Sequence, residues 1–394
     1  MSTKHVILRS LSQTRGGPAR IPGAGPATVA PSMPVAVEVE EMDARRATNL
    51  ARTSEVVAVA PVMPMRLIEP VATSPVAEPA APAVAWGIEA VGATSSPFDG
   101  DGITVAVLDT GIDKSHPAFA GVELILKNFT TASDDDQNGH GTHCAGTIFG
   151  RKVGGTRIGV APGVKRALIG KVLGAGGGGS GQIVQAIQWS VTNGANVISM
   201  SLGIDFPGFV QELTQQGFPV ELATSVALDG YRKNVLLFER VSALLAAQGA
   251  FMQASLIVAA AGNESRRDEN ADFEIAVAPP AVADGIVSVA ALGQGSNGLT
   301  VAPFSNYGAR VSGPGVDVTS ARVGGGLTNK SGTSMATPHV AGVAALWAQK
   351  LTMTGQGNGE LLANRLIGSA TTAPLAPGFD PADVGAGIVR APQD

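Results

Sequence analysis

Apolar residues in this chain of 394 residues alternate between short continuous runs and longer amphipathic segments. Residues 103–109 are almost all apolar and end in a carboxylate, which is the pattern of a buried parallel strand. Residues 181–192 repeat apolar side chains at helical spacing. The same alternation continues, and it predicts strands over 167–172, 196–200, 255–261 and 285–291 and helices over 235–248 and 334–350. It indicates an α/β fold with three αβα layers, in which helices cover both faces of a mainly parallel central sheet.

The first 72 residues follow another pattern and predict a small N-terminal α+β module. Short apolar runs predict strands over 5–8, 35–40, 56–59 and 63–68, and Asp43 is placed to cap a helix over 44–52. Residues 10–32, rich in Gly, Pro and Ala, predict a loop or disordered insert. Residues 73–85 carry prolines among Ala and Val, as an exposed linker does. From residue 86 to 394 we expect one large domain.

Composition narrows the classes of function. Apolar residues make up 44% of the chain and charged residues 15%, which indicates a folded globular protein. The net charge is −5 without a basic block, so we expect no nucleic-acid partner. No apolar stretch is long enough to span a bilayer, and residues 1–20 lack the apolar run of a secretory signal peptide. The expectation is a monomer without a membrane partner, cytoplasmic by default, with export by another route left open.

Three polar residues lie at the ends of predicted strands or at the start of a predicted helix, where functional sites of α/β proteins are found. Asp109 and Asn263 come directly after strands, and the carboxyl ends of parallel strands share one edge. Ser334 follows a glycine at the start of a helix, where backbone N–H groups favour an oxyanion. Turn formation by Asp109 and Asn263 and helix capping by Ser334 are the ordinary alternatives.

Two histidines, His140 and His143, lie in one segment rich in small residues. A general base must reach both the serine and the carboxylate, and residue chemistry alone leaves both histidines open. With Cys144 they resemble metal ligands, but no matching Cys/His pair occurs elsewhere, so we expect no metal site. The glycine run at 174–181 lacks the lysine of a phosphate loop, which favours a surface loop beside a cleft.

Taken in order, these segments resemble the subtilisin-like serine proteases (subtilases) over residues 86–389. The resemblance rests on Val-Leu-Asp-Thr-Gly-Ile-Asp at 107–113, Gly-His-Gly-Thr-His-Cys-Ala-Gly at 139–146, Ala-Ala-Gly-Asn at 260–263 and Gly-Thr-Ser-Met-Ala-Thr-Pro-His at 332–339. It implies a serine endopeptidase that hydrolyses peptide bonds in protein or peptide substrates through an acyl-enzyme on Ser334. In the family pattern His140 is the general base and Asp109 orients it. Asn263 and the Ser334 N–H form the oxyanion hole, and no cofactor is required. A non-catalytic protein on the same fold is the alternative. The serine-carboxyl peptidases are a further one, against which His140 and Asn263 argue.

The resemblance also implies where substrate binds. Ser201, Leu202 and Gly203 match the backbone edge that pairs with an extended peptide, and Ser180 and Gly181 match the opposing edge. Small residues are expected to line the first pocket and leave room for a large apolar side chain: Ser199, Ser201, Ala260 and Gly262. An acidic cluster interrupted by two arginines favours basic substrates instead, so the specificity stays open: Glu264, Asp268, Glu269 and Asp272.

Four features of this chain bear on regulation, metal binding and specificity. The N-terminal module resembles the family's inhibitory propeptide, which implies a zymogen whose module binds its own enzyme domain and is cleaved off in the linker; a permanent accessory domain is the alternative. Ala118 stands where many members carry a calcium-binding aspartate, so structural calcium stays open, with no ligands assigned. Residues 209–245 exceed the smaller members and predict a helical insertion that modifies specificity or docks a partner. Cys144 resembles the free cysteine of one branch, although a small buried apolar role is the simpler one.

Overall fold

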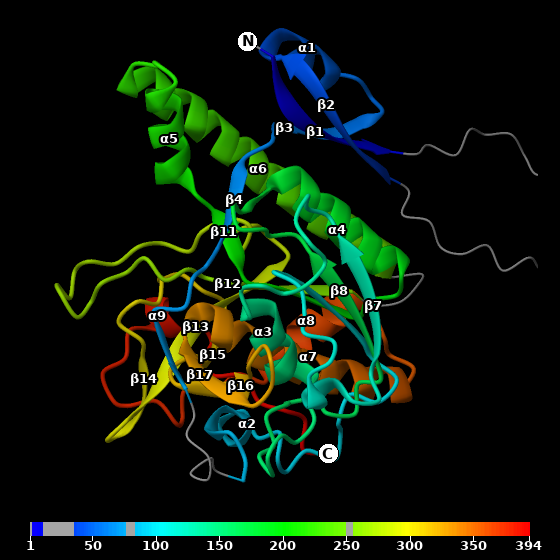
Figure 1. The fold of residues 1–394 in the computed structure, drawn as a ribbon, viewed down its shortest axis with the longest axis vertical. Helices are drawn as coiled ribbons and strands as arrows, with labels where there is room; N and C mark the ends of the chain where they lie inside the picture. The colour runs from blue at the N-terminus through cyan, green and yellow to red at the C-terminus, as the bar shows by residue number, and fades with distance from the viewer. Residues whose placement is uncertain (1, 11–34, 76–82, 250–254) are drawn as a thin grey trace, which may run out of the picture.

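A mainly parallel sheet forms the centre of the computed structural model, which describes residues 2–10, 35–75, 83–249 and 255–394 (Figure 1). The predicted glycine- and proline-rich insert lies outside these residues, apart from Ser10. Eight described strands form the sheet in the order β14-β13-β12-β10-β6-β8-β7, with β15 beside β13. Every neighbouring pair is parallel except β13 and β14. The strands are β6 (Thr104–Asp109), β7 (Glu123–Asn128), β8 (Arg166–Lys171), β10 (Val197–Met200), β12 (Leu256–Ala260), β13 (Ile286–Gly295), β14 (Gly298–Val301) and β15 (Val311–Pro314).

Helices cover both faces of this sheet, which confirms the predicted three-layer fold. In β6, Val105 and Val107 join the apolar cluster on the face of α3 (His140–Phe149) and α7 (Thr333–Met353). Ala106 and Leu108 join the cluster on the face of α4 (Ser180–Thr192) and α6 (Val220–Gly249). Successive strand residues therefore meet different layers, and this explains why residues 105–108 are all apolar. The remaining described helices are α1 (Ala44–Leu50), α2 (Trp86–Ala90), α5 (Phe206–Gln215), α8 (Gly359–Gly368), α9 (Pro381–Val384) and the short 3-10 helix Pro117–Phe119.

The N-terminal module is an antiparallel sheet in the order β2-β1-β3 with α1 against it. Its strands are β1 (Ser2–Ser10), β2 (Val35–Asp43) and β3 (Val56–Pro61). Asp43 caps α1 by accepting a hydrogen bond from the Arg46 N–H, as expected.

The last predicted strand of the module takes a different place. β4 (Pro64–Leu67) does not join the module's sheet; it pairs with β9 (Gly178–Gly179) on one side and β11 (Leu202–Ile204) on the other. Met63 and Met65 are buried, and both belong to the apolar cluster shared with α4 and α6. The apolar pattern of this segment thus reflects contact with the large domain.

The predicted insertion is helical but begins earlier than the pattern indicated. It contains α5 and α6, and α6 starts at Val220, whereas the prediction began the helix at 235. From Val220 to Gly230 the buried positions of α6 are the small residues Ala223, Ala227 and Gly230, which carry a weak apolar signal. α6 passes below the N-terminal module in the view of Figure 1 and contacts β3. None of the described helices is long and apolar enough to cross a membrane.

The start of the predicted linker is structured. β5 (Ala72–Pro75) pairs antiparallel with β17 (Leu327–Ser331), whose other neighbour is β16 (Val318–Ala321). Residues 76–82, the middle of that linker, lie outside the described residues. The chain between the module and α2 therefore passes along the segment that leads into α7.

Candidate active site

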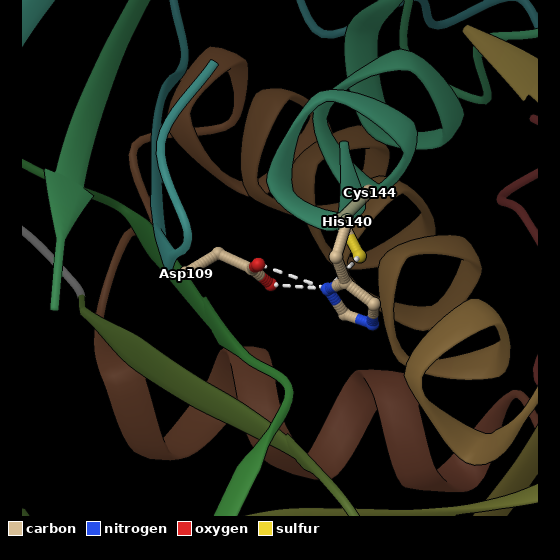
Figure 2. Close-up of side chains that lie close together, drawn as sticks. All are labelled: Asp109, His140 and Cys144. Carbon is tan, nitrogen blue, oxygen red and sulfur yellow. Dashed lines mark hydrogen bonds and ion pairs between the residues drawn. The ribbon is translucent and has the colours of Figure 1, made fainter. Parts of the chain in front are cut away.

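The carboxylate of Asp109 and the imidazole of His140 form a buried pair (Figure 2). Asp109 ends β6 and His140 begins α3, and the Nδ1 atom lies 2.9 and 3.0 Å from the two carboxylate oxygens. The approach depends on Gly141, because a Cβ there would collide with the Gly111 carbonyl in the turn after β6. The structure therefore places His140, and not His143, against the carboxylate.

The surroundings set the protonation of the histidines. Burial lowers the pKa of His140, but the charge of Asp109, together with Cys144, outweighs it and raises the pKa from 6.5 to about 10. Burial lowers the pKa of His143 well below 6.5, and its Nε2 hydrogen-bonds with the Val318 carbonyl. Burial also lowers the pKa of His339 to about 4. His140 is thus the histidine in this region that holds a proton most strongly, and it acts as a general base only in its deprotonated form.

Ser334 lies in the first turn of α7, and its side chain points at the N-terminal segment. Gly332 precedes the helix, and the hydroxyl of Ser334 donates a hydrogen bond of 2.8 Å to the Ile68 carbonyl. Among the described residues, His140 Nε2 is buried without a hydrogen-bond partner. The serine is therefore turned away from the imidazole nitrogen that faces it in a working triad, and onto the chain that covers the site.

The amide of Asn263 faces the same segment. Its Oδ1 accepts hydrogen bonds of 2.8 Å from both the N–H and the hydroxyl of Thr333. Because two donors hold the oxygen, the amide nitrogen must point the other way, and it donates a hydrogen bond of 2.8 Å to the Glu69 carbonyl. Asn263 and the N-terminus of α7 therefore form a donor pair beside Ser334.

One predicted substrate edge pairs with the chain's own N-terminal segment. Leu202 and Gly203 lie in β11 opposite Leu67 and Arg66. The Ser201 carbonyl continues the ladder by accepting a hydrogen bond of 3.3 Å from the Ile68 N–H. The cleft edge thus holds an extended strand up to the residue that Ser334 contacts.

The opposing edge lies about two residues before the predicted pair. Gly178 and Gly179 form β9 opposite Met65 and Pro64. Ser180 exchanges hydrogen bonds with Met63 through its N–H and hydroxyl, at 3.0 and 3.1 Å. Gly181 lies inside α4, where a Cβ would stand 3.1 Å from Val39 of the module. Gly181 therefore contacts the module's sheet rather than the strand in the cleft.

Two of the four residues predicted for the first pocket lie beside Asn263. Ala260 ends β12 and is fully buried. Gly262 adopts a φ of 118°, in the region that favours glycine, and its N–H donates to the Thr333 hydroxyl. The turn is thereby tied to the start of α7, while the role of these residues in a pocket stays a prediction.

Asp136 is a buried carboxylate that the sequence analysis missed. It accepts hydrogen bonds from the Thr110 hydroxyl and from the N–H and hydroxyl of Thr142, at 2.9, 2.9 and 2.6 Å. Burial raises the pKa of Asp136, but these bonds and one from the Gly139 N–H outweigh it and hold the pKa below its usual value. Asp136 thus joins the turn after Asp109 to the first turn of α3. The acidic run directly before the histidine motif was the available signal.

Replacing Asp136 with Asn is expected to weaken the connection between the turn after Asp109 and the first turn of α3. The amide nitrogen would face a donor from Thr142, which leaves a buried N–H or hydroxyl unpaired and costs about 1–3 kcal/mol in the free energy of unfolding. Displacement of His140 is expected to lower kcat roughly 10-fold or more with little change in KM. Urea unfolding and peptide hydrolysis measure both effects. Asp135→Asn, at an exposed neighbour, is the control; equal losses in both variants would contradict the role of Asp136.

One group of metal-capable side chains occurs among the described residues: Asp109, His140 and Cys144. Cys144 is buried, and its sulfur lies 3.6 Å from His140 Nδ1 and 3.4 Å from the Ser334 carbonyl (Figure 2). Burial raises the pKa of this thiol, so it stays protonated at neutral pH. The Asp109 carboxylate already hydrogen-bonds with the histidine nitrogen that the thiol approaches. We therefore interpret these three side chains as a site of proton transfer.

Comparisons with known proteins agree with this geometry. The sequence profile described as the subtilase family, peptidase S8, matches residues 100–386. A thermostable alkaline protease of Halalkalibacterium halodurans is 37% identical over 271 residues, which cover 67% of this chain and 62% of that protein. The M-protease of Shouchella clausii is 34% identical over 73% of this chain and 69% of its own length. Subtilisin Savinase of Lederbergia lenta is 36% identical over 68% of this chain and 86% of its own length. On the matching profile, the central sheet and the clustered motif residues, this chain belongs to the subtilase family of serine peptidases.

Proposed function

We propose that this protein is a serine endopeptidase that is made as a zymogen and cleaves its own N-terminal segment. One observation carries the proposal: a strand of the chain itself lies between the two edges of the cleft, and its Ile68 and Glu69 carbonyls meet the Ser334 hydroxyl and the Asn263 amide. A peptide held in this way presents its backbone to a nucleophile and an oxyanion donor.

The chemistry follows from four side chains. Ser334 Oγ forms a bond to the substrate carbonyl carbon and gives its proton to His140 Nε2, while Asp109 stabilises the imidazolium. The oxyanion is held by Asn263 Nδ2 and the Ser334 N–H. Collapse breaks the C–N bond, and His140 donates the proton to the leaving amine. Water, deprotonated by His140, then hydrolyses the ester and restores Ser334. All these groups belong to the chain, so we propose that no cofactor takes part.

The N-terminal segment covers the active site, and this supports the proposal that the protein is made as a zymogen. The N-terminal module shares the apolar cluster of α4 and α6, and its last strand fills the cleft. In this arrangement Ser334 donates to Ile68 instead of to His140, so the hydroxyl must rotate before attack. The module therefore acts as an inhibitor in cis for as long as the segment stays in place.

We propose that self-cleavage occurs between Ile68 and Glu69, just before the predicted linker. The Ile68 carbonyl is the one beside the serine hydroxyl, and the strand ladder runs in register up to the Ile68 N–H. Asn263 contacts the carbonyl of the next bond, between Glu69 and Pro70, but this bond ends at a proline nitrogen, which carries no N–H and restricts the backbone before it. Cleavage at the first bond avoids that obstacle. Proteins and peptides with an apolar residue before the cleaved bond are then the expected substrates.

A fluorophosphonate probe tests the function directly. We expect the full chain, once it has processed itself, to hydrolyse casein and to carry the probe on the peptide that contains Ser334, because an activated serine beside an oxyanion hole reacts with such reagents. Peptide mapping by mass spectrometry locates the label. Absence of label on Ser334 in the processed chain, together with no hydrolysis of casein, would exclude the endopeptidase.

A further inference from the structure

We propose that Asp205 and the insertion that follows it, α5 and α6, extend the substrate groove to the sixth residue before the cleaved bond. They would select a basic side chain at the third residue and a large apolar side chain at the sixth. This inference rests on the proposed endopeptidase function, in which the segment from Met63 to Ile68 occupies the cleft as a substrate does.

The basic preference follows from an ion pair across the cleft edge. Arg66 lies two residues before Ile68, and its guanidinium is 3.1 Å from the Asp205 carboxylate. The same carboxylate caps α5 by accepting a hydrogen bond from the Gly208 N–H, which holds it in place. The Arg66 side chain is 52% exposed and that of Asp205 22%, so the pair discriminates modestly.

The apolar preference follows from the contact between α6 and Met63. Met63 is fully buried, and a Cβ added to Gly230 would lie 2.7 Å from its sulfur. One turn further along α6, the buried Asn234 donates a hydrogen bond of 2.8 Å to the Pro61 carbonyl. The glycine leaves room for the side chain while the asparagine holds the backbone that leads to it. The helix thus forms one wall of a site for the sixth residue.

Release of the segment up to Ile68 would free both sites for another chain. The sites lie on the large domain, next to the strand edges β9 and β11, which bind any extended backbone without regard to its side chains. The occupant we infer is therefore an extended protein segment that places a basic and an apolar residue where Arg66 and Met63 now lie.

Quenched fluorescent peptides that copy residues 63–72 test the inference on the self-processed full chain. We expect kcat/KM to fall about 3-fold when the arginine is replaced with glutamine, which is the size of a partly exposed ion pair. We expect a fall of about 10-fold when the first methionine is replaced with aspartate, because its burial is lost. Equal rates for all these peptides would overturn the inference and leave the protease intact. Failure to cleave any peptide would instead overturn the proposed function.

Variants separate the two sites. Asp205→Asn keeps a capping oxygen but removes the charge, so the preference for arginine over glutamine is expected to disappear. Asp229→Asn, an exposed carboxylate of the same insertion, is the matched control that keeps it. In the Gly230→Leu variant, the peptide that copies residues 63–72 is expected to be cleaved no faster than a shorter peptide. This shorter peptide begins at the fourth residue before the cleaved bond and therefore lacks the sixth. Lys233→Leu, exposed on the same helix, is its control. An arginine preference that survives Asp205→Asn would contradict this assignment.

Discussion

The full chain with Ser334→Ala is expected to remain one polypeptide of 39.6 kDa, whereas the unaltered chain divides between Ile68 and Glu69. The reason is geometric, because the Ser334 hydroxyl lies 2.8 Å from the Ile68 carbonyl and is the only atom replaced. Added peptides are expected to be cleaved about 10⁶-fold more slowly, a loss already established for the nucleophile of the relative subtilisin.

N-terminal sequencing and intact mass spectrometry measure this result. The large fragment of the unaltered chain is expected to begin Glu-Pro-Val, and Ser296→Ala, in the exposed turn between β13 and β14, is expected to process normally. Division of the Ser334→Ala chain at the same bond and rate would show that another protease cuts it. A large fragment that begins within residues 73–85 would show that cleavage occurs in the predicted linker and not after Ile68.

Asp109→Asn is expected to lower kcat about 10⁴-fold, comparable to the loss known when this carboxylate is removed from subtilisin. Asp109 accepts a hydrogen bond from His140 Nδ1 and thereby holds the tautomer that leaves Nε2 free to take a proton. An asparagine keeps the shape but removes the charge that stabilises the imidazolium. The KM of short peptides is expected to change little, since Asp109 lies behind the histidine.

The same substitution tests the charge balance at His140. Burial lowers its pKa and Asp109 raises it to about 10, so removal of the carboxylate should bring the pKa below 6.5. NMR titration of His140 in the intact Ser334→Ala chain, with and without Asp109→Asn, measures the difference. Because the folded pKa exceeds the unfolded one, the pair stabilises the fold fully below pH 6.5 and loses this effect as the pH rises toward 10. Asp109→Asn should remove that slope, and an unchanged titration would contradict the coupling.

Prediction from sequence was most successful where local pattern and local chemistry coincide. The apolar run before Asp109 predicted β6 because helices cover both faces of the sheet, so the side chains of residues 105–108 are buried on either face. The motif around Ser334 predicted the start of α7 within one residue. Small buried residues misled the reading of α6, because Ala223, Ala227 and Gly230 pack against other elements without an apolar signal of their own.

Taken alone, the sequence determined the fold class and the order of Asp109, His140, Asn263 and Ser334, and it predicted a separate N-terminal module. These follow from periodicity and from residue types at element ends, which are local properties. The family resemblance had implied His140 as the partner of Asp109, where residue chemistry left His143 open, and the tertiary structure shows this contact. Only the tertiary structure decided that Asp136 joins their two loops and that residues 64–67 lie in the cleft instead of the module's sheet. Such contacts join residues far apart in the chain, so no pattern in either segment specifies its partner.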